Sequence, residues 1–299
     1  MAFPRSPTVT AMGAWDIHAA SDGRFHLGLG AQVKQHNEPR FGISWTAPAP
    51  RMRDYVGATR ALWRCWEETE PLNYISDNHK LTLMTPNFMP EPSGLQPPPL
   101  SIAAVGPAML RLAGEMCDGA RLHPFMTAKY LTEVSRVEIT EGLRRGARDR
   151  SELEIVADTL IATGPDQDAV RKMREYIRYR IAFYASTPAY WPVLSAHGLD
   201  ELGKKLIEYP RADRWSEMAA QIPDELIDLV AVSGTWDTIA DRIEERYAGH
   251  VDTIYLPIDH DLPIDEHRLA RVVERVQHIQ CEFKGYRDDW ALRAPPLAS

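Results

Sequence analysis

Apolar and polar positions alternate along the chain in blocks that predict strands and helices in turn. Short apolar runs, typical of buried strands, lie at 24–30, 100–105, 120–123, 153–164 and 251–258. Between them, apolar residues recur every three or four positions, which indicates amphipathic helices. Strands that alternate with helices predict a parallel α/β architecture, either a doubly wound sheet or a (β/α)8 barrel.

Two helices near the N-terminus have clear apolar faces. In the first, from Thr8, the pattern predicts a buried face made by Val9, Met12, Trp15, Ile17 and Ala19. The second, over 51–68, is predicted to bury Val56, Leu62, Trp63 and Trp66. Prolines in the segment before position 51 predict a loop between the strand at 24–30 and this second helix.

The segment 100–123 is the most informative window. Its apolar strand ends at Gly106-Pro107, which predicts a sharp turn with proline at the first helical position. The helix that follows is predicted to end at Asp118-Gly119, before the strand at 120–123. A strand, a helix and a strand within so few residues indicate a βαβ unit of a parallel sheet.

The second half is read as part of the same single domain, residues 1–299. Segment 183–225 is rich in aromatic residues and proline and is predicted to be an insertion with short helices. Further on, Ser233-Gly234-Thr235 is interpreted as a cap between two helices. A last helix over 265–284 is predicted to be capped by Asp265, with Glu266 in its first turn.

Composition narrows the function classes. With a net charge of −8 over 299 residues, the chain lacks the basic character of a nucleic-acid-binding protein. Cys65, Cys117 and Cys281 are far apart, which fits a reducing compartment and argues against a disulfide framework or a structural zinc site. No apolar run reaches the length of a membrane span, so we expect a cytoplasmic protein that acts on a small molecule.

Glycine and polar residues follow the predicted strands where a barrel places its working groups. Gly28-Leu29-Gly30 would let the backbone approach a flat ring, and Gln32 could bond the ring edge. The alternative is a glycine-terminated strand with a solvated glutamine. Gly106 to Met109 could hold a phosphate at a helix N-terminus, or form an ordinary turn. A dinucleotide-binding motif is not supported, because GLGAQV lacks the third glycine.

Other side chains have both functional and structural interpretations. His123 could donate a hydrogen bond to a ring, act as an acid or base, or be a structural histidine at the end of a strand. The aromatic residues of the insertion could form a wall over a substrate or a satellite hydrophobic cluster, namely Phe183, Tyr184, Tyr190 and Trp191. Cationic residues after the first strand suit an anion or a solvated surface, namely Lys34, His36 and Arg40.

A metal site is not predicted. The segment YLPIDHDLPIDEH gathers acidic residues and histidines at Asp259, His260, Asp261, Asp265, Glu266 and His267. Its spacing matches no metal-binding motif, and helix capping explains Asp265 and Glu266 better.

Four segments together resemble a known family. They are DGRFHLGLGAQVKQHNEPRFGISWTAPAPRMRDYVGATRALW, AAVGPAMLRLAGEMCDGARLHPF, AFYASTPAYWPVLSAHG and SGTWDTIADRIEERYAGHVDTIYL. In this order, over essentially the whole chain, they resemble the luciferase-like monooxygenase superfamily, and most closely its branch of oxidoreductases that depend on the deazaflavin coenzyme F420. The motif DGRF-x-LGLG and the motif GP-x-ML-x-LA are specific to the superfamily, and AFYASTPAY is more specific to the branch.

The resemblance implies a (β/α)8 barrel with the cofactor ring at its C-terminal mouth. Relatives carry two further strands and most of a third before the position of Met1, so we expect a barrel that is incomplete at its N-terminal side, about 60 to 80 residues shorter at ~30 residues per unit. Carried onto this chain, the implied cofactor-binding residues are Gly30, Ala31, Gln32, Ala104, Val105, Gly106, Pro107, Ala108 and Met109. The implied catalytic residue is His123, and relatives usually carry further catalytic residues on the absent second strand.

Three functions follow as hypotheses. The first is an oxidoreductase that transfers a hydride between F420 and an unknown organic substrate. The second is an FMN-dependent monooxygenase on the same barrel. The third is a truncated protein that binds a flavin without turnover. A barrel with open strand edges also has reason to pair with a second copy, so a homodimer is possible.

Overall fold

Parallel strands form the centre of the protein. We describe residues 1–256 and 265–286 of a computed structural model. The main sheet has five strands in the order β1-β4-β5-β6-β9, and every neighbouring pair in it is parallel. A second parallel pair is formed by β7 and β8, and an antiparallel hairpin by β2 and β3. The strands are Leu27–Leu29 (β1), Tyr74–Ile75 (β2), Lys80–Leu81 (β3), Leu100–Ala104 (β4), Gly119–Leu122 (β5), Glu154–Asp158 (β6), Ile161–Gly164 (β7), Val232–Thr235 (β8) and Thr253–Tyr255 (β9).

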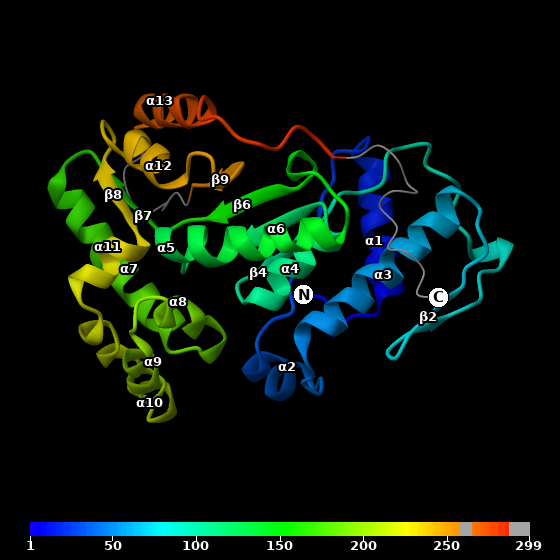
Figure 1. Cartoon of the computed structure of the whole chain (residues 1–299), viewed down its shortest axis with the longest axis horizontal. Coiled ribbons are helices and arrows are strands. Elements are labelled where there is room, and N and C mark those ends of the chain that lie inside the picture. The colour runs from blue at the N-terminus through cyan, green and yellow to red at the C-terminus, as the bar shows by residue number, and fades with distance from the viewer. Residues whose placement is uncertain (257–264, 287–299) are drawn as a thin grey trace.

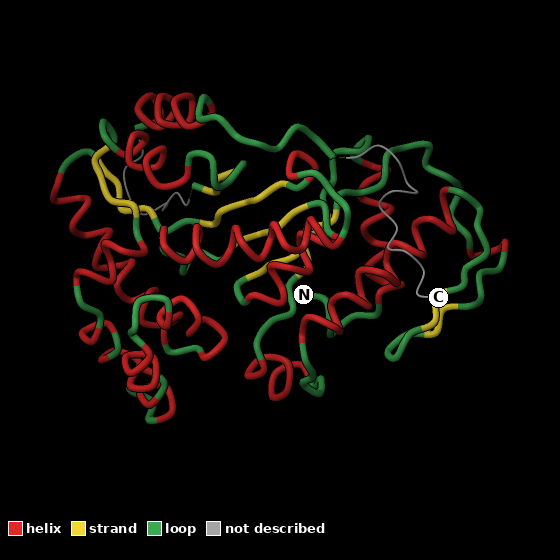
Figure 2. Tube along the Cα trace, viewed as in Figure 1, coloured by secondary structure: helices red, strands yellow, loops and turns green. Residues whose placement is uncertain are grey.

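Helices surround these strands, and their placement is seen in Figures 1 and 2. At one end of the molecule α1 and α3 lie beside the β2–β3 hairpin, and at the other end α7 to α11 form a separate group. The helices are Pro7–Ala20 (α1), Lys34–Phe41 (α2), Pro48–Glu67 (α3), Pro107–Met116 (α4), Ala128–Tyr130 (α5), Arg136–Arg145 (α6), Gln167–Ala185 (α7), Trp191–Ser195 (α8), Asp200–Leu206 (α9), Glu208–Arg211 (α10), Asp224–Val230 (α11), Ile239–Tyr247 (α12) and Glu266–Gln277 (α13), with a π-helical turn at Leu131–Ser135 between α5 and α6. Across the residues described, no helix is long and apolar enough to cross a bilayer.

The predicted parallel α/β architecture is confirmed, and the described strands do not close into a ring. Strand β1 is one edge of the main sheet. At its end, the Ala2 N–H donates to the Gly30 carbonyl at 3.0 Å, so the chain before α1 runs beside the end of β1. The βαβ unit over 100–122 has the predicted form, with Gly106 before α4 and Pro107 as the first helical residue.

Three local predictions were wrong. The segment 153–164 is not one strand: Thr159 and Leu160 separate β6 from β7, and these two strands belong to different sheets. Residues 232–235 are not a helix cap but strand β8, because their backbone pairs with β7 from Ile161 to Gly164. The predicted loop before α3 contains α2, which ends at the left-handed Gly42 (φ 65°).

The first helix buries a different face from the predicted one. Val9, Met12 and Ile17 are 60%, 49% and 51% exposed, whereas Ala11 and Ala14 are buried beside Trp15. Small residues of α1 face α3 because the large side chains of α3 fill the space between the two helices. Those side chains are buried as predicted, namely Val56, Leu62, Trp63 and Trp66. The Trp63 indole N–H donates to the Ala11 carbonyl at 3.0 Å, which requires close approach of the two helices.

Helices α4 and α6 cross at two glycines. A Cβ atom built on Gly142 would lie 2.1 Å from the Arg111 carbonyl oxygen, and one built on Gly114 would lie 2.3 Å from the Ile139 carbonyl oxygen. Both contacts are with backbone, which cannot move without separating the helices. Glycine at these positions therefore sets the distance between α4 and α6.

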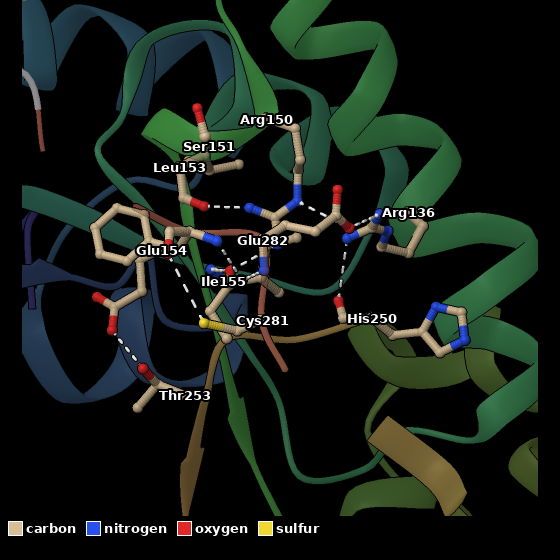
Figure 3. Close-up of polar contacts among 12 residues, drawn as sticks. Arg136, Arg150, Ser151, Leu153, Glu154, Ile155, His250, Thr253, Cys281 and Glu282 are labelled. Carbon is tan, nitrogen blue, oxygen red and sulfur yellow. Dashed lines mark hydrogen bonds and ion pairs between the residues drawn. The ribbon is translucent and has the colours of Figure 1, made fainter. Parts of the chain in front are cut away.

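A segment after α13, residues 281–286, fastens to the amino-terminal end of the sheet, and Figure 3 shows part of these contacts. The Asp252 carboxylate is 1% exposed and accepts from the Arg150 guanidinium at 2.6 Å. It also accepts backbone N–H groups from Ile155 (2.8 Å), Glu282 (3.0 Å) and Phe283 (2.9 Å). One buried carboxylate thus joins strand β6, the start of β9 and the returning chain.

Charged and aromatic side chains extend the same attachment. Glu282 pairs with Arg136 at 2.6 Å and approaches Arg150 at 3.8 Å. The Tyr286 hydroxyl donates to Glu154, and its ring meets His26 edge-on with centroids 5.0 Å apart. Because His26 precedes β1 and Glu154 begins β6, one tyrosine contacts two strands that β4 and β5 separate in the sheet.

Candidate functional site

The ends of three adjacent strands carry the residues predicted to bind a cofactor. In the register of the sheet, Leu29 of β1 lies beside Ile102 of β4, and Ala104 of β4 lies beside Leu122 of β5. The segments after these strands therefore start side by side. Gly30, Val105 and His123 come from distant parts of the sequence and meet at the carboxyl end of one sheet, as parallel strand ends do.

Asn37 stabilises the loop after β1 through hydrogen bonds to its backbone. This role was not predicted from the sequence. Asn37 is fully buried, and its amide group donates to the carbonyls of Ala31 (3.0 Å) and Val33 (3.1 Å). Between them, Gln32 adopts a left-handed conformation (φ 58°) and is exposed. Such a conformation is costly for a residue with a Cβ atom, so the surrounding bonds must maintain it. An asparagine within a polar loop gave the only sequence signal.

The three basic residues that could bind an anion, Lys34, His36 and Arg40, lie on α2 near the surface. Lys34 pairs with Glu38 at 3.7 Å, and the Arg40 guanidinium lies over the Phe41 ring at 5.1 Å. His36 is half-buried on the same helix. Their contacts are those of a solvated helix, and they give no support to an anion site there.

The turn between β4 and α4 carries the first backbone N–H groups of a helix. Gly106 is the N-cap of α4, has extended backbone (φ −74°, ψ 155°) and, as a glycine, has no side chain to cap the helix. A Cβ atom built on Gly106 would meet nothing within 4 Å, so the turn faces open space. Met109 is buried, which leaves the backbone of the first turn, rather than its side chains, to contact an anion.

Tyr130 stabilises this turn through a hydrogen bond to its backbone, a role that was also not predicted from the sequence. It lies in α5, is 1% exposed, and its hydroxyl donates to the Val105 carbonyl at 3.0 Å. Burial raises the pKa of this phenol to about 12, so it stays protonated and keeps donating. Tyr130 thereby fixes the residue between β4 and the glycine turn.

His123 follows β5 and has a defined tautomer. Its Nδ1 atom accepts the backbone N–H of Phe125 at 3.0 Å, which places the proton on Nε2. Burial, together with the nearby Arg180 charge, lowers the pKa of the imidazole to about 3. A neutral ring with an Nε2–H group is a hydrogen-bond donor, and this favours the donor role over that of a general acid near pH 7.

The low pKa of His123 gives a pH-dependent stability. Below about pH 6.5 the unfolded chain protonates this imidazole while the folded chain does not, so the unfolded state binds more protons and stability falls as pH falls. From pH 6.5 to 5, we expect the native protein to lose about 2 kcal/mol more unfolding free energy than His123→Phe. Urea unfolding at several pH values measures this difference.

The control for this experiment is His267→Gln, at an exposed position on α13. Its pH dependence should match that of the native protein. Burial also lowers the pKa values of His79 and His197, but these residues are the same in all three proteins and cancel in the comparison. Equal slopes for native protein and His123→Phe would show that His123 titrates normally.

Aromatic rings from the predicted insertion surround His123. The Tyr190 ring stacks on the imidazole, with centroids 4.1 Å apart and planes at 24°, and the Tyr184 ring meets it edge-on at 4.6 Å. Phe183 continues the group, 5.7 Å from Tyr184. Trp191 is turned elsewhere, since its indole donates to the Ala185 carbonyl at 2.9 Å. Three of the four predicted aromatic residues thus gather beside the strand end.

A groove of about 490 Å³ with several charged side chains in its lining lies between α3, α4 and the hairpin. Its charges are largely paired: Arg53 contacts Glu115 at 2.8 Å, and Asp54 accepts from Tyr74 at 2.9 Å and Asn78 at 2.7 Å. Ala108 also lines it, so the groove begins beside the first turn of α4. Two further arginines of its lining are also paired, Arg111 with Glu138 at 2.7 Å and Arg145 with Glu141 at 2.7 Å.

No group of metal-ligating side chains occurs among the residues that the structure describes. Asp259, His260 and Asp261 lie outside them. Asp265 caps α13 as predicted, with its carboxylate accepting the Arg268 N–H at 3.0 Å, and Glu266 lies in the first turn.

Comparison with known proteins gives a family match over most of the chain. The profile of the luciferase-like monooxygenase family matches residues 1–253. An uncharacterised protein of Mycobacterium tuberculosis is 41% identical over 258 residues, which are 86% of this chain and 76% of that protein. The 5,10-methylenetetrahydromethanopterin reductase of Archaeoglobus fulgidus is 32% identical over 247 residues, 80% of this chain and 69% of that one.

A solved structure shows the same architecture. The coenzyme F420-dependent tetrahydromethanopterin reductase of Methanopyrus kandleri superposes with a TM-score of 0.69 at 22% identity, covering 92% of this chain and 78% of that one. This likeness, together with the family match, confirms the fold predicted from the sequence, a luciferase-like (β/α)8 type whose described strands do not close into a barrel. The chain spans about three quarters of the length of that structure.

Proposed function

The chain belongs to the luciferase-like monooxygenase family, and on that premise we propose that it is an oxidoreductase that transfers a hydride between coenzyme F420 and an organic substrate. The observation that carries the proposal is the meeting of the loop after β1, the turn before α4 and His123 at one end of the sheet. The relative named as a methylenetetrahydromethanopterin reductase, at 32% identity, supports a reductase over an oxygenase.

The residues present fit a deazaflavin cofactor in two respects. The first turn of α4 has an uncapped N-terminus and a glycine that faces open space, which suits a phosphate group. At the end of β1, a Cβ atom built on Gly30 would meet only the Cβ atom of Ala103 within 4 Å, at an ordinary contact distance of 3.9 Å, and its absence leaves the backbone open to a ring.

When bound, F420 would supply hydride transfer at C5 of its ring. The residues of this chain would bind the cofactor and orient it toward the substrate. Gly106 and Ala108 can donate backbone N–H groups to the phosphate, while Asn37 holds the carbonyls around Gln32. The Nε2–H of His123 can donate to an oxygen of the ring or the substrate.

An FMN-dependent monooxygenase is the second candidate, because the matched family is described as monooxygenases. It would require oxygen and a reductase partner. The two candidates differ in the cofactor bound, since FMN lacks the glutamate tail of F420.

The experiment is a fluorescence titration of the chain with F420, with FMN as competitor. We expect saturable F420 binding that FMN does not displace. Binding of FMN in its place would favour the monooxygenase. Binding of neither cofactor would contradict both catalytic proposals for this chain.

A variant of the α4 turn makes the titration specific. Gly106→Asp should weaken F420 binding at least about tenfold, because a carboxylate at the N-cap occupies the free N–H groups and repels phosphate. The same change should leave the fold intact or stabilise it, since Gly106 has negative φ and open space. Gly106→Ala adds only a methyl group and is the matched control. Equal affinity of both variants would place the phosphate elsewhere.

A further inference from the structure

Arg180, on α7, differs from its neighbours on the same helix. Arg174 pairs with Asp228 at 2.7 Å, and Arg178 pairs with Glu175 at 2.9 Å. Within the described part of the chain, Arg180 forms no ion pair with a carboxylate; its guanidinium donates to the Tyr184 hydroxyl at 2.9 Å and also interacts with the phenol of Tyr176. The group is half-buried. A half-buried cation bonded to a phenol retains hydrogen-bonding capacity that a carboxylate would satisfy better.

The surroundings of Arg180 connect it to His123. The guanidinium carbon lies 5.8 Å from the centre of the Tyr184 ring, and that ring is 4.6 Å from the imidazole of His123. The charge of Arg180 is close enough to lower the pKa of His123. With Nδ1 of His123 occupied by the Phe125 N–H, its Nε2–H remains as a second donor.

The cluster of Arg180, His123, Tyr184 and Tyr190 therefore offers hydrogen-bond donors and positive charge but no carboxylate. It presents a cation and a neutral N–H donor beside the rings of Tyr184 and Tyr190, and no carboxylate of the described residues pairs with either donor. A guanidinium recognises a carboxylate through two parallel N–H groups, and aromatic faces accept a flat apolar body.

We propose that Arg180 and His123 recognise a carboxylate attached to an aromatic or flat apolar group, which packs on Tyr184 and Tyr190. This assignment rests on the proposed function, because it names the substrate class of the same strand-end site. The source that fits this description is the substrate; the glutamate tail of F420 carries carboxylates without a flat group and is the competing source that the second test distinguishes.

The first test uses the chain without cofactor and the probe pair phenylacetate and phenylacetamide, which differ mainly in charge. We expect phenylacetate to bind at least about tenfold more tightly by ligand-observed NMR, since a bond to a charged group contributes more than a neutral one. Equal affinities for the two probes would overturn the proposal. A failure to bind F420 would leave this result readable, so the two proposals fail separately.

Substitutions of single residues show which side chains cause the preference for phenylacetate over phenylacetamide. Arg180→Gln should remove the preference for phenylacetate, and Arg180→Lys should retain part of it. His123→Phe keeps a ring beside Tyr190 and should lose a smaller part. The control is Lys172→Gln, which removes one positive charge from the same helix at an exposed position. An unchanged preference in Arg180→Gln, with the native melting temperature, would refute the role of Arg180.

The second test identifies the source of the carboxylate. Phenylacetate binding is repeated with the chain saturated with F420, and F420 is compared with its tail-free core, the deazaflavin nucleoside. Retained phenylacetate binding assigns the carboxylate to the substrate. Displacement, together with weaker binding of F420 but not of the core by Arg180→Gln, assigns it to the tail. If Arg180→Gln changes neither probe nor cofactor affinity, the proposal is wrong.

Discussion

Replacing Asp252 with alanine should lower the free energy of unfolding by about 3–5 kcal/mol, the range for removal of one partner from a buried ion pair. The carboxylate is 1% exposed and serves the Arg150 guanidinium and three backbone N–H groups. Without it, these donors stay buried and lose their acceptor, and each such loss costs more than the bond contributed. Urea unfolding followed by tryptophan fluorescence measures the change.

Asp241→Ala is the matched control for this experiment. Asp241 faces Arg275 at 3.3 Å but is 71% exposed, so its removal should cost less than about 1 kcal/mol. Hydrogen exchange adds a local readout: the amides of Glu282 and Phe283 should exchange faster in Asp252→Ala. A loss below 1 kcal/mol, with unchanged exchange, would mean that the segment after α13 is held by its other contacts.

The second large effect is expected at the crossing of α4 and α6. In Gly142→Ala the new methyl group would sit 2.1 Å from the Arg111 carbonyl oxygen, and the nearest atoms are all backbone. The helices must separate, and we expect a loss of about 3 kcal/mol or more in unfolding free energy. Because α4 begins with the Gly106 turn, F420 affinity should fall as well.

Gly13→Ala is the matched control on α1. Gly13 is exposed, and a Cβ atom there would meet nothing within 4 Å. The substitution should raise the unfolding free energy by about 0.5–1 kcal/mol, the helix-propensity difference between the two residues. Similar effects of the two substitutions would show that α4 and α6 accommodate the methyl group by a small shift.

Local sequence signals predicted the elements that are strongly apolar or strongly marked. The strand at 100–104, the Gly106-Pro107 turn and the buried face of α3 all follow from runs and periods within one segment. Asp265 was recognised as a cap because its role involves only the following turn. Such features need no knowledge of distant partners.

Predictions failed where the structure of a segment depends on a packing or pairing partner that is distant in sequence. For α1, the apolar period favoured Val9, Met12 and Ile17, but the large tryptophans of α3 require small residues opposite them, so Ala11 and Ala14 are buried. The segment Val232–Thr235 is too short and polar to read as a strand, and it becomes one by pairing with β7. Asn37 and Tyr130 act through hydrogen bonds to the backbone beside the site, which no spacing revealed.

The sequence by itself determined the alternation of strands and helices, the family, and the glycine turns that follow β1 and β4, because these depend on residue type and on neighbours in the chain. Only the tertiary structure decided which strand ends lie together, which tautomer His123 adopts, and that Arg180 is left beside it without a carboxylate partner among the described residues. Register, burial and charge pairing arise between segments that are far apart in sequence. They therefore set the chemistry of the site without leaving a local pattern.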